Sequence, residues 1–161
     1  PALYAGGHFA EAGDVEALAL ASDLVVHGRV TEVKSAWSGD GKLINTRVSV
    51  QPMDVWRGTG LSSIEIWVPG GSVGDIAQVV SHVATFERHE EVVVFLKKDP
   101  LAPQNVARFR VAGQLRGKLK VERRSVAAPA TIAPGAVPEA SASVSPAALT
   151  ELRRRVRAVP P

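Results

Sequence analysis

Histidine and glutamate are the residue types in this chain that could bind a metal ion or move a proton. The histidines stand at four positions: His8, His27, His82 and His89. Glu87, Glu90 and Glu91 lie close to the last two, so three metal ligands could come from this stretch. It lacks, however, the HExxH spacing that places two histidines on one face of a helix. Residues 88–91 are typical of an exposed turn, and we expect no metal site there.

Other catalytic and cofactor motifs are also missing from the sequence. Gly70-Gly-Ser-Val-Gly74 has the glycines of a phosphate-binding loop, but no Lys-Ser/Thr follows it and it does not open a helix. The chain has no cysteine, which excludes disulfides, thiolate nucleophiles and Cys-based zinc sites. We therefore predict no catalytic residue, no cofactor and no enzymatic activity.

Three tryptophans, Trp37, Trp56 and Trp67, lie near the ends of expected strands. On an open barrel face such rings could stack on bases or sugars and form a surface platform. A surface for single-stranded nucleic acid also needs Lys and Arg on the same strands. Residues 1–115 carry 10 basic and 13 acidic side chains, so packing in the core or at the barrel rim is the favoured interpretation.

The basic charge lies in the last third of the chain. Residues 116–161 carry 9 basic and 3 acidic side chains. Such a local excess indicates contact with something acidic, such as the surface of a partner; the alternative is a solvated helix face and one charged strand. A further alternative is binding of a polyanion or single-stranded nucleic acid by Arg116–Arg124 and Arg153–Arg157.

The elements that would position these residues are mostly short strands. Apolar residues alternate with a period of two, and glycine-containing turns separate the runs. We expect strands at about 24–36, 43–55, 63–68, 76–83, 92–96, 106–112 and 115–121. Val92–Leu96 is apolar throughout and predicts a central strand buried on both faces. The pattern predicts a mainly β fold, a small antiparallel OB-like barrel or sandwich, with a short N-terminal helix over 11–22.

The C-terminal region differs from the rest in composition. We divide the chain into a barrel domain with the N-terminal helix (1–124), a Pro/Ala/Ser-rich extended linker (125–146) and a basic amphipathic helix (147–161), with Ser145 as N-cap. The helix carries an apolar stripe flanked by arginines. We predict that this stripe binds the same barrel or, as the favoured version, a second copy of the chain, through Leu149, Leu152, Arg153, Arg154, Val156 and Arg157.

Several segments resemble a known group of domains. They are Ala21-Ser-Asp-Leu-Val-Val-His-Gly-Arg-Val-Thr-Glu-Val33, Val55-Trp-Arg-Gly58, Val68-Pro-Gly-Gly71, Phe86 through Phe95-Leu96, and Val111-Ala-Gly-Gln-Leu-Arg-Gly-Lys118. Through these segments, the stretch Leu18–Val121 resembles uncharacterised extracytoplasmic bacterial β-barrel domains. Those domains are distantly similar to the netrin/tissue-inhibitor-of-metalloproteinase barrel, an OB-type fold. His89 stands where the group has glycine, which predicts a differently shaped turn.

The resemblance implies an exported, non-enzymatic module in the periplasm or outside the cell, its signal peptide removed. The metalloproteinase inhibitors act through an N-terminal cysteine, which this chain lacks. No apolar run approaches the roughly eighteen residues that span a membrane. We therefore predict a protein–protein interaction or structural assembly module that self-associates through its C-terminal arm, and we consider a nucleic-acid partner the weaker alternative.

Overall fold

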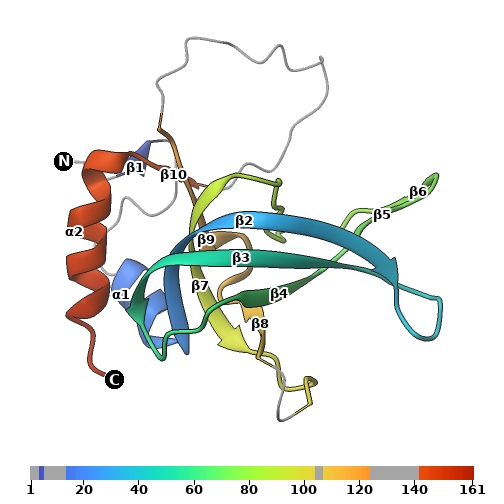
Figure 1. Cartoon of the computed structure of the whole chain (residues 1–161), viewed down its shortest axis with the longest axis horizontal. Helices are drawn as coiled ribbons and strands as arrows, with labels where there is room; N and C mark the ends of the chain where they lie inside the picture. The colour runs from blue at the N-terminus through green and yellow to red at the C-terminus, as the bar shows by residue number, and fades with distance from the viewer. Residues whose placement is uncertain (1–3, 6–13, 104–106, 124–141) are drawn as a thin grey trace.

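The computed structural model describes residues 4–5, 14–103, 107–123 and 142–161. Its centre is a closed barrel of five strands (Figure 1): β2 (Leu24–Trp37), β3 (Ile44–Arg57), β4 (Ile64–Pro69), β8 (Arg108–Val111) and β7 (Glu91–Lys98). In this order each strand pairs with the next, and β7 pairs back with β2. The expected mainly β fold and small barrel are thus confirmed.

The sequence predicted an antiparallel barrel, but one pair of strands in the barrel is parallel. β4 and β8 are parallel, whereas the other four pairs are antiparallel. A closed ring with an odd number of strands cannot alternate in direction all the way round, so one neighbouring pair must be parallel. The last two expected strands also do not pair with each other. β8 pairs with Leu96–Lys98 of β7, and β9 (Lys118–Val121) pairs with Val92–Val94, while η2 (Gln114–Gly117) carries the chain between them.

β7 separates two apolar clusters. Every side chain from Val92 to Leu96 is 0% exposed, which confirms the predicted central strand. Because successive strand side chains point to opposite faces, Val92, Val94 and Leu96 pack inside the barrel with residues of β2, β3 and β4. Val93 and Phe95 face the other way and pack in a second cluster with the helices. This strand therefore belongs to both halves of the core.

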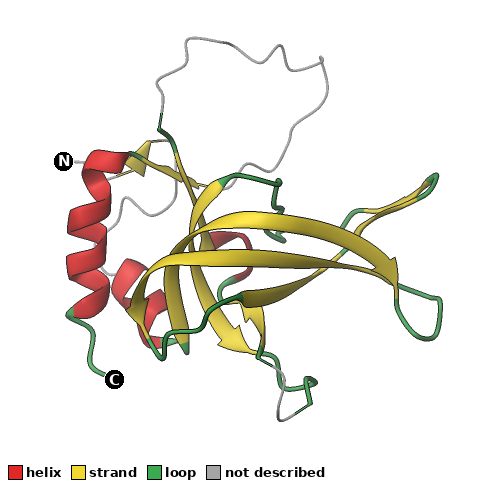
Figure 2. Cartoon of the chain, viewed as in Figure 1, coloured by secondary structure: helices red, strands yellow, loops and turns green. Residues whose placement is uncertain are grey.

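The second cluster lies between the barrel and an outer layer of two helices (Figure 2), α1 (Asp14–Leu20) and α2 (Pro146–Arg157). The sheet continues past β9 with β10 (Ala142–Val144), which is parallel to β9, and β1 (Tyr4–Ala5), which is antiparallel to β10. The Ser145 side chain caps α2 by accepting a hydrogen bond from the backbone N–H of Ala148. β10 falls within the expected extended linker, whose residues 125–141 lie outside the described part of the chain.

A small hairpin of β5 (Gly71–Val73) and β6 (Ile76–Gln78) projects from the barrel beside the β2–β3 turn. The expected strand over 76–83 ends at Gln78. Val79 and Val80 are exposed, and the backbone turns at His82, whose φ is 61°. The chain then returns to the barrel and buries Ala84 and Phe86 in its core without pairing as a strand.

Gly28 and Gly58, two glycines of the segments that carry the resemblance, allow a close approach of the backbone. A Cβ atom on Gly28 would lie 2.6 Å from the carbonyl oxygen of Gln51, where β2 and β3 shift register. Gly58 has a φ of +92°, and its Cβ would lie 2.4 Å from the carbonyl oxygen of Asp23. His89 takes a φ of 73°, a left-handed conformation that glycine adopts without strain. No helix among the described residues is long and apolar enough to cross a membrane.

Candidate partner-binding surface

The apolar stripe of α2 lies against this chain's own barrel. Leu152 and Val156 are 0% exposed, and both pack in the cluster that contains Val15, Trp56 and Phe95; Leu149 packs at its edge. Of the two docking modes that the sequence left open, the structure has the one within the chain. Leu152 and Val156 are thus covered by this chain itself, whereas Leu149 is only partly buried.

Two of the three predicted arginines attach α2 to one acidic residue of the barrel domain. Arg153 Nε lies 2.8 Å from Asp54 Oδ2 and Arg157 Nη2 lies 3.6 Å from Asp54 Oδ1. Arg154 pairs with Glu151 on the same helix. The three predicted partner-binding arginines therefore already have partners within the chain.

Two further arginines fix the ends of this contact. Arg155 donates two hydrogen bonds to Glu16 of α1, at 2.8 and 2.7 Å, and this interaction holds the pKa of the Glu16 carboxyl below its usual value. Arg57 Nη1 donates to the carbonyl oxygens of Val159 and Pro160, at 3.2 and 2.9 Å. The C-terminal segment is thus attached to α1 and to the end of β3.

These contacts explain the uneven charge of the sequence. Among the described residues from 116 onward, seven of the eight basic side chains form ion pairs. In six of the seven the partner is an acidic residue of the first 115. Lys118 is one of them: its buried Nζ lies 2.7 Å from Glu90 Oε1, and desolvation lowers the pKa of the lysine. The two oppositely charged parts of the chain neutralise each other, which leaves few cations here for a polyanion.

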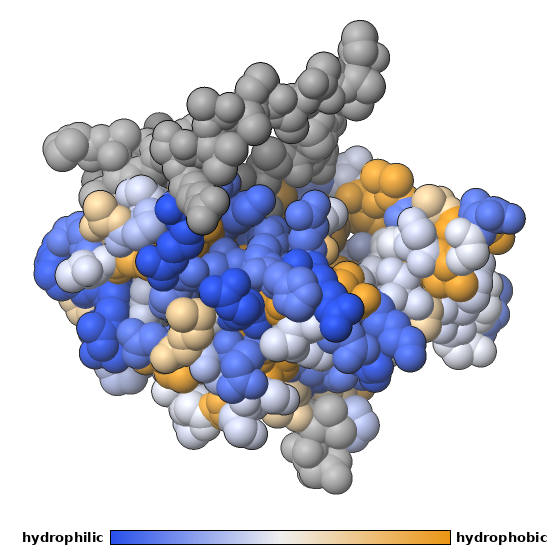
Figure 3. Space-filling model, turned by 45° about the horizontal axis from the view of Figure 1, so that its top comes forward, coloured by the Kyte–Doolittle hydropathy of each residue, from blue (hydrophilic) through white to orange (hydrophobic). Residues whose placement is uncertain are grey.

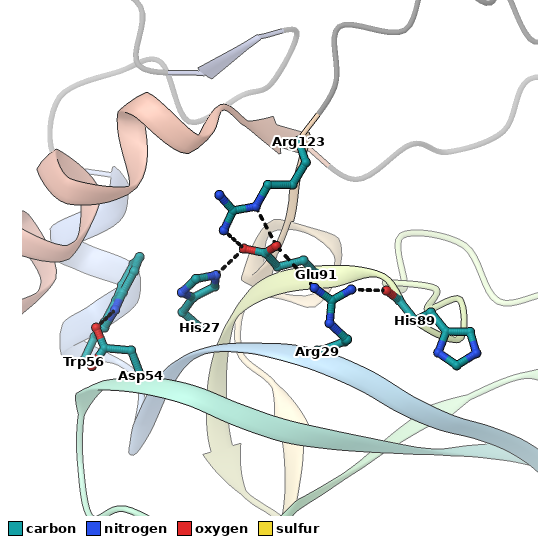
Figure 4. A network of polar contacts seen from close by, with 7 residues as sticks. All are labelled: His27, Arg29, Asp54, Trp56, His89, Glu91 and Arg123. Carbon is teal, nitrogen blue, oxygen red and sulfur yellow. Dashed lines mark hydrogen bonds and ion pairs between the residues drawn. The ribbon is translucent and has the colours of Figure 1, made fainter.

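The centre of this charge pairing is a cluster around Glu91 (Figure 4). Its side chain is 4% exposed and accepts hydrogen bonds from Arg123 at 2.8 and 2.6 Å. His27 Nε2 lies 2.5 Å from Glu91 Oε2, and Arg29 donates to the carbonyl oxygen of His89 beside it. Arg123 first, and then His27, lower the pKa of Glu91 against the opposing effect of burial.

The sequence interpretation missed the role of Glu91, because it placed this residue in an exposed turn. Glu91 instead opens β7 and lies on the same face as Val93 and Phe95, under the outer layer. Glu91 stands two residues before the buried Val93, and this spacing was the sequence signal that could have revealed that Glu91 lies on a buried strand face. Within the described ranges no group of three or more His, Asp and Glu side chains could hold a metal ion.

The three tryptophans do not form one platform. Trp56 is 5% exposed, packs in the helix-side cluster and donates its Nε1–H to Asp54 at 3.1 Å, so it is a core residue. Trp37, at 39% exposed, and Trp67 line a shared cavity of about 430 Å³. We call this the Trp37 cavity; its remaining lining residues are Lys34, Ala36, Ser38, Gly39, Asn45 and Arg47.

A second cavity of about 510 Å³ shares Trp67 and Asn45 with the first. We call it the Leu101 cavity, after the 76% exposed leucine at its rim, and its other apolar lining residues include Leu43, Val83 and Val111. The two cavities together are named the Trp67 groove. Figure 3 shows apolar side chains on the right-hand part of the surface, where the β2–β3 turn and the β5–β6 hairpin lie.

Two contacts orient the Trp67 ring between the two cavities. The Arg108 guanidinium lies 4.2 Å from the centroid of its ring, and the indole Nε1–H donates to Glu65 Oε2 at 3.0 Å. Arg108 and Arg110 both pair with the buried carboxylate of Asp99, at 2.8 and 3.1 Å. Burial raises the pKa of Asp99, but hydrogen bonds from Leu101 and Arg108 outweigh it, so the pKa is lowered.

Comparison of the chain with protein-family models, with curated proteins and with solved structures finds no match. The candidate surface therefore rests on the geometry of the Trp67 groove.

Proposed function

We propose that this protein is a non-enzymatic protein-interaction module on an OB-like barrel, and that its partner binds in the Trp67 groove. The observation that carries the proposal is Trp67, in contact with Arg108 and Glu65, between two adjoining cavities, with Trp37, Leu43 and Leu101 exposed around them. Residues that dominate binding energy in protein interfaces are mainly tryptophan, tyrosine and arginine in well-packed pockets.

The fold supports the OB-like assignment and, with it, the resemblance to exported barrel domains. A five-stranded Greek-key barrel is characteristic of OB-type domains, which bind ligands across adjacent strands and the loops that flank them. The Trp67 groove lies in the corresponding region, on β3, β4 and β8 and the loop after β7. Location in the periplasm or outside the cell is part of the same proposal and rests on the resemblance.

The groove is a better partner surface than the C-terminal arm. Leu152 and Val156 of α2 are 0% exposed, whereas Leu43 and Leu101 are 60% and 76% exposed. Large exposed apolar residues that gather around a pocket are typical of binding sites. In this proposal the arm stabilises the barrel domain, and the partner binds at the opposite end.

The experiment is a selection from a displayed peptide library on the full chain, followed by binding to two variants. The groove variant carries Trp37→Ala and Leu101→Asp; the control carries Leu20→Asp and Met53→Ala, two exposed apolar residues outside the groove. We expect the selected peptides to bind the wild-type and control proteins and to lose binding to the groove variant. Equal binding to all three proteins, or no enrichment, would contradict the proposal.

A second candidate function, binding of single-stranded nucleic acid, is favoured by one observation. Lys34 and Arg47 line the Trp37 cavity beside two tryptophans, an arrangement that suits a base and its phosphate. Its test is titration with oligonucleotides at low salt, with quenching of tryptophan fluorescence and a steep salt dependence as the expected result. Absence of quenching at low salt would exclude it.

A further inference from the structure

The two cavities of the Trp67 groove differ in charge. The lining of the Trp37 cavity contains two cations, Lys34 and Arg47, and no carboxylate. Lys34 is exposed and forms no ion pair with the described residues; Arg47 Nε is 3.6 Å from Glu65 Oε1 and remains half exposed. A cation beside partly buried aromatic rings attracts an anionic group more strongly than one in open solvent. This cavity therefore suits a carboxylate.

The Leu101 cavity has the opposite character. Its walls include Leu43, Val83, Leu101 and Val111, and its two arginines are already paired with Asp99. A pocket with mainly apolar walls and neutralised polar groups binds an apolar side chain best. A nucleic acid would need unpaired cations along both cavities, and this second cavity does not supply them.

Because the cavities share Trp67 and Asn45, one short segment can occupy both. In an extended peptide, side chains two residues apart lie on the same face, about 7 Å from each other. We propose that the partner binds through an extended peptide segment that places a carboxylate in the Trp37 cavity and a large apolar side chain in the Leu101 cavity. This inference rests on the proposed function and names the chemistry of the partner.

The probes are synthetic pentapeptides that contain one Leu and one Asp, separated by one to three glycines, with blocked termini. Binding is measured by tryptophan fluorescence and calorimetry on the full chain. For the best peptide, replacement of Asp with Asn should weaken binding about fivefold, the effect of a favourable half-exposed ion pair. Replacement of Leu with Ala should weaken binding about tenfold or more, through lost apolar burial.

Variants of the protein assign each half of the peptide to its cavity. Lys34→Gln should weaken the Asp peptide but not the Asn peptide, whereas Leu101→Ala should weaken both to the same degree. Lys97→Gln is the matched control, because Lys97 is an exposed lysine of β7 outside both cavities, and it should change neither.

The outcomes separate this inference from the function on which it rests. The inference of an acidic–apolar peptide is wrong if selected peptides bind in the groove but carry no carboxylate, or if the Asn and Asp peptides bind equally. Either result leaves the proposed function as an interaction module uncontradicted. If neither the library nor the pentapeptides bind at the groove, both are wrong. Displacement of a bound peptide by an oligonucleotide, with steep salt dependence, would overturn the inference in favour of the second candidate function.

Discussion

Replacing Leu152 with alanine tests whether α2 docks on its own barrel, as the structure has it. The leucine is 0% exposed and packs between α1 and the outer face of the barrel. The substitution removes three buried carbon atoms, worth about 2.4 kcal/mol at roughly 0.8 kcal/mol each. Incomplete relaxation of the resulting cavity adds to this loss. We expect the free energy of unfolding to fall by about 3 kcal/mol.

The assay is equilibrium unfolding in urea, followed by tryptophan fluorescence, to which Trp56 contributes from the same cluster. Thr150→Ala is the control, because Thr150 is exposed on the same helix; its effect should stay within about 0.7 kcal/mol, the span of helix propensities. Docking within one chain also makes the unfolding midpoint independent of protein concentration. A loss below about 1 kcal/mol for Leu152→Ala, or a midpoint that rises with concentration, would refute the reasoning.

Two further predictions concern the turn before β7 and the buried carboxylate that opens it. His89→Gly should raise the free energy of unfolding by up to about 1 kcal/mol, because glycine adopts the φ of 73° at this position without strain. Gly58→Ala should lower the free energy of unfolding in the same urea assay, because Gly58 has a φ of +92° and lies against the Asp23 carbonyl oxygen. Changes of equal sign in the two variants would contradict this account. Arg123 and His27 hold the pKa of Glu91 below its ordinary value of 4.5, so the stabilisation is present above pH 4.5 and is lost as the pH falls through the folded-state pKa. Glu91→Gln should therefore flatten the loss of stability on acidification below pH 4.5; an unchanged pH profile would show that ionised Glu91 does not stabilise the fold.

Local patterns predicted the main strands well. The alternation from Leu24 to Ala36 corresponds to β2, and the apolar run Val92–Leu96 lies within β7. These predictions succeed because a period of two reports which side chains share a face, whatever the strand's neighbours are. The partners of the strands were predicted less well: β8 pairs with β4 and β7 rather than with β9. Pairing depends on how the whole barrel closes, which no local period contains.

The residues of the candidate surface were likewise predicted only in part from the sequence. The sequence identified Trp37 and Trp67, but it grouped them with Trp56, whose ring lies in the core. It also missed Leu43 and Leu101, since exposed leucines in turns have no periodic signature. What places these residues around one groove is the meeting of the β2–β3 turn, β4, β8 and the loop after β7.

The sequence by itself determined the fold class, the position of the main strands and the opposite charges of the body and the C-terminal region. Only the tertiary structure decided that these charges meet within one chain, as when Arg155 reaches Glu16 and Arg153 reaches Asp54. The physical reason is that backbone conformation follows from neighbouring residues, whereas contacts between distant residues depend on the loop entropy and the burial that the complete fold provides. The same long-range packing that buries Leu152 and Val156 of α2 leaves the Trp67 groove open on the described part of the surface.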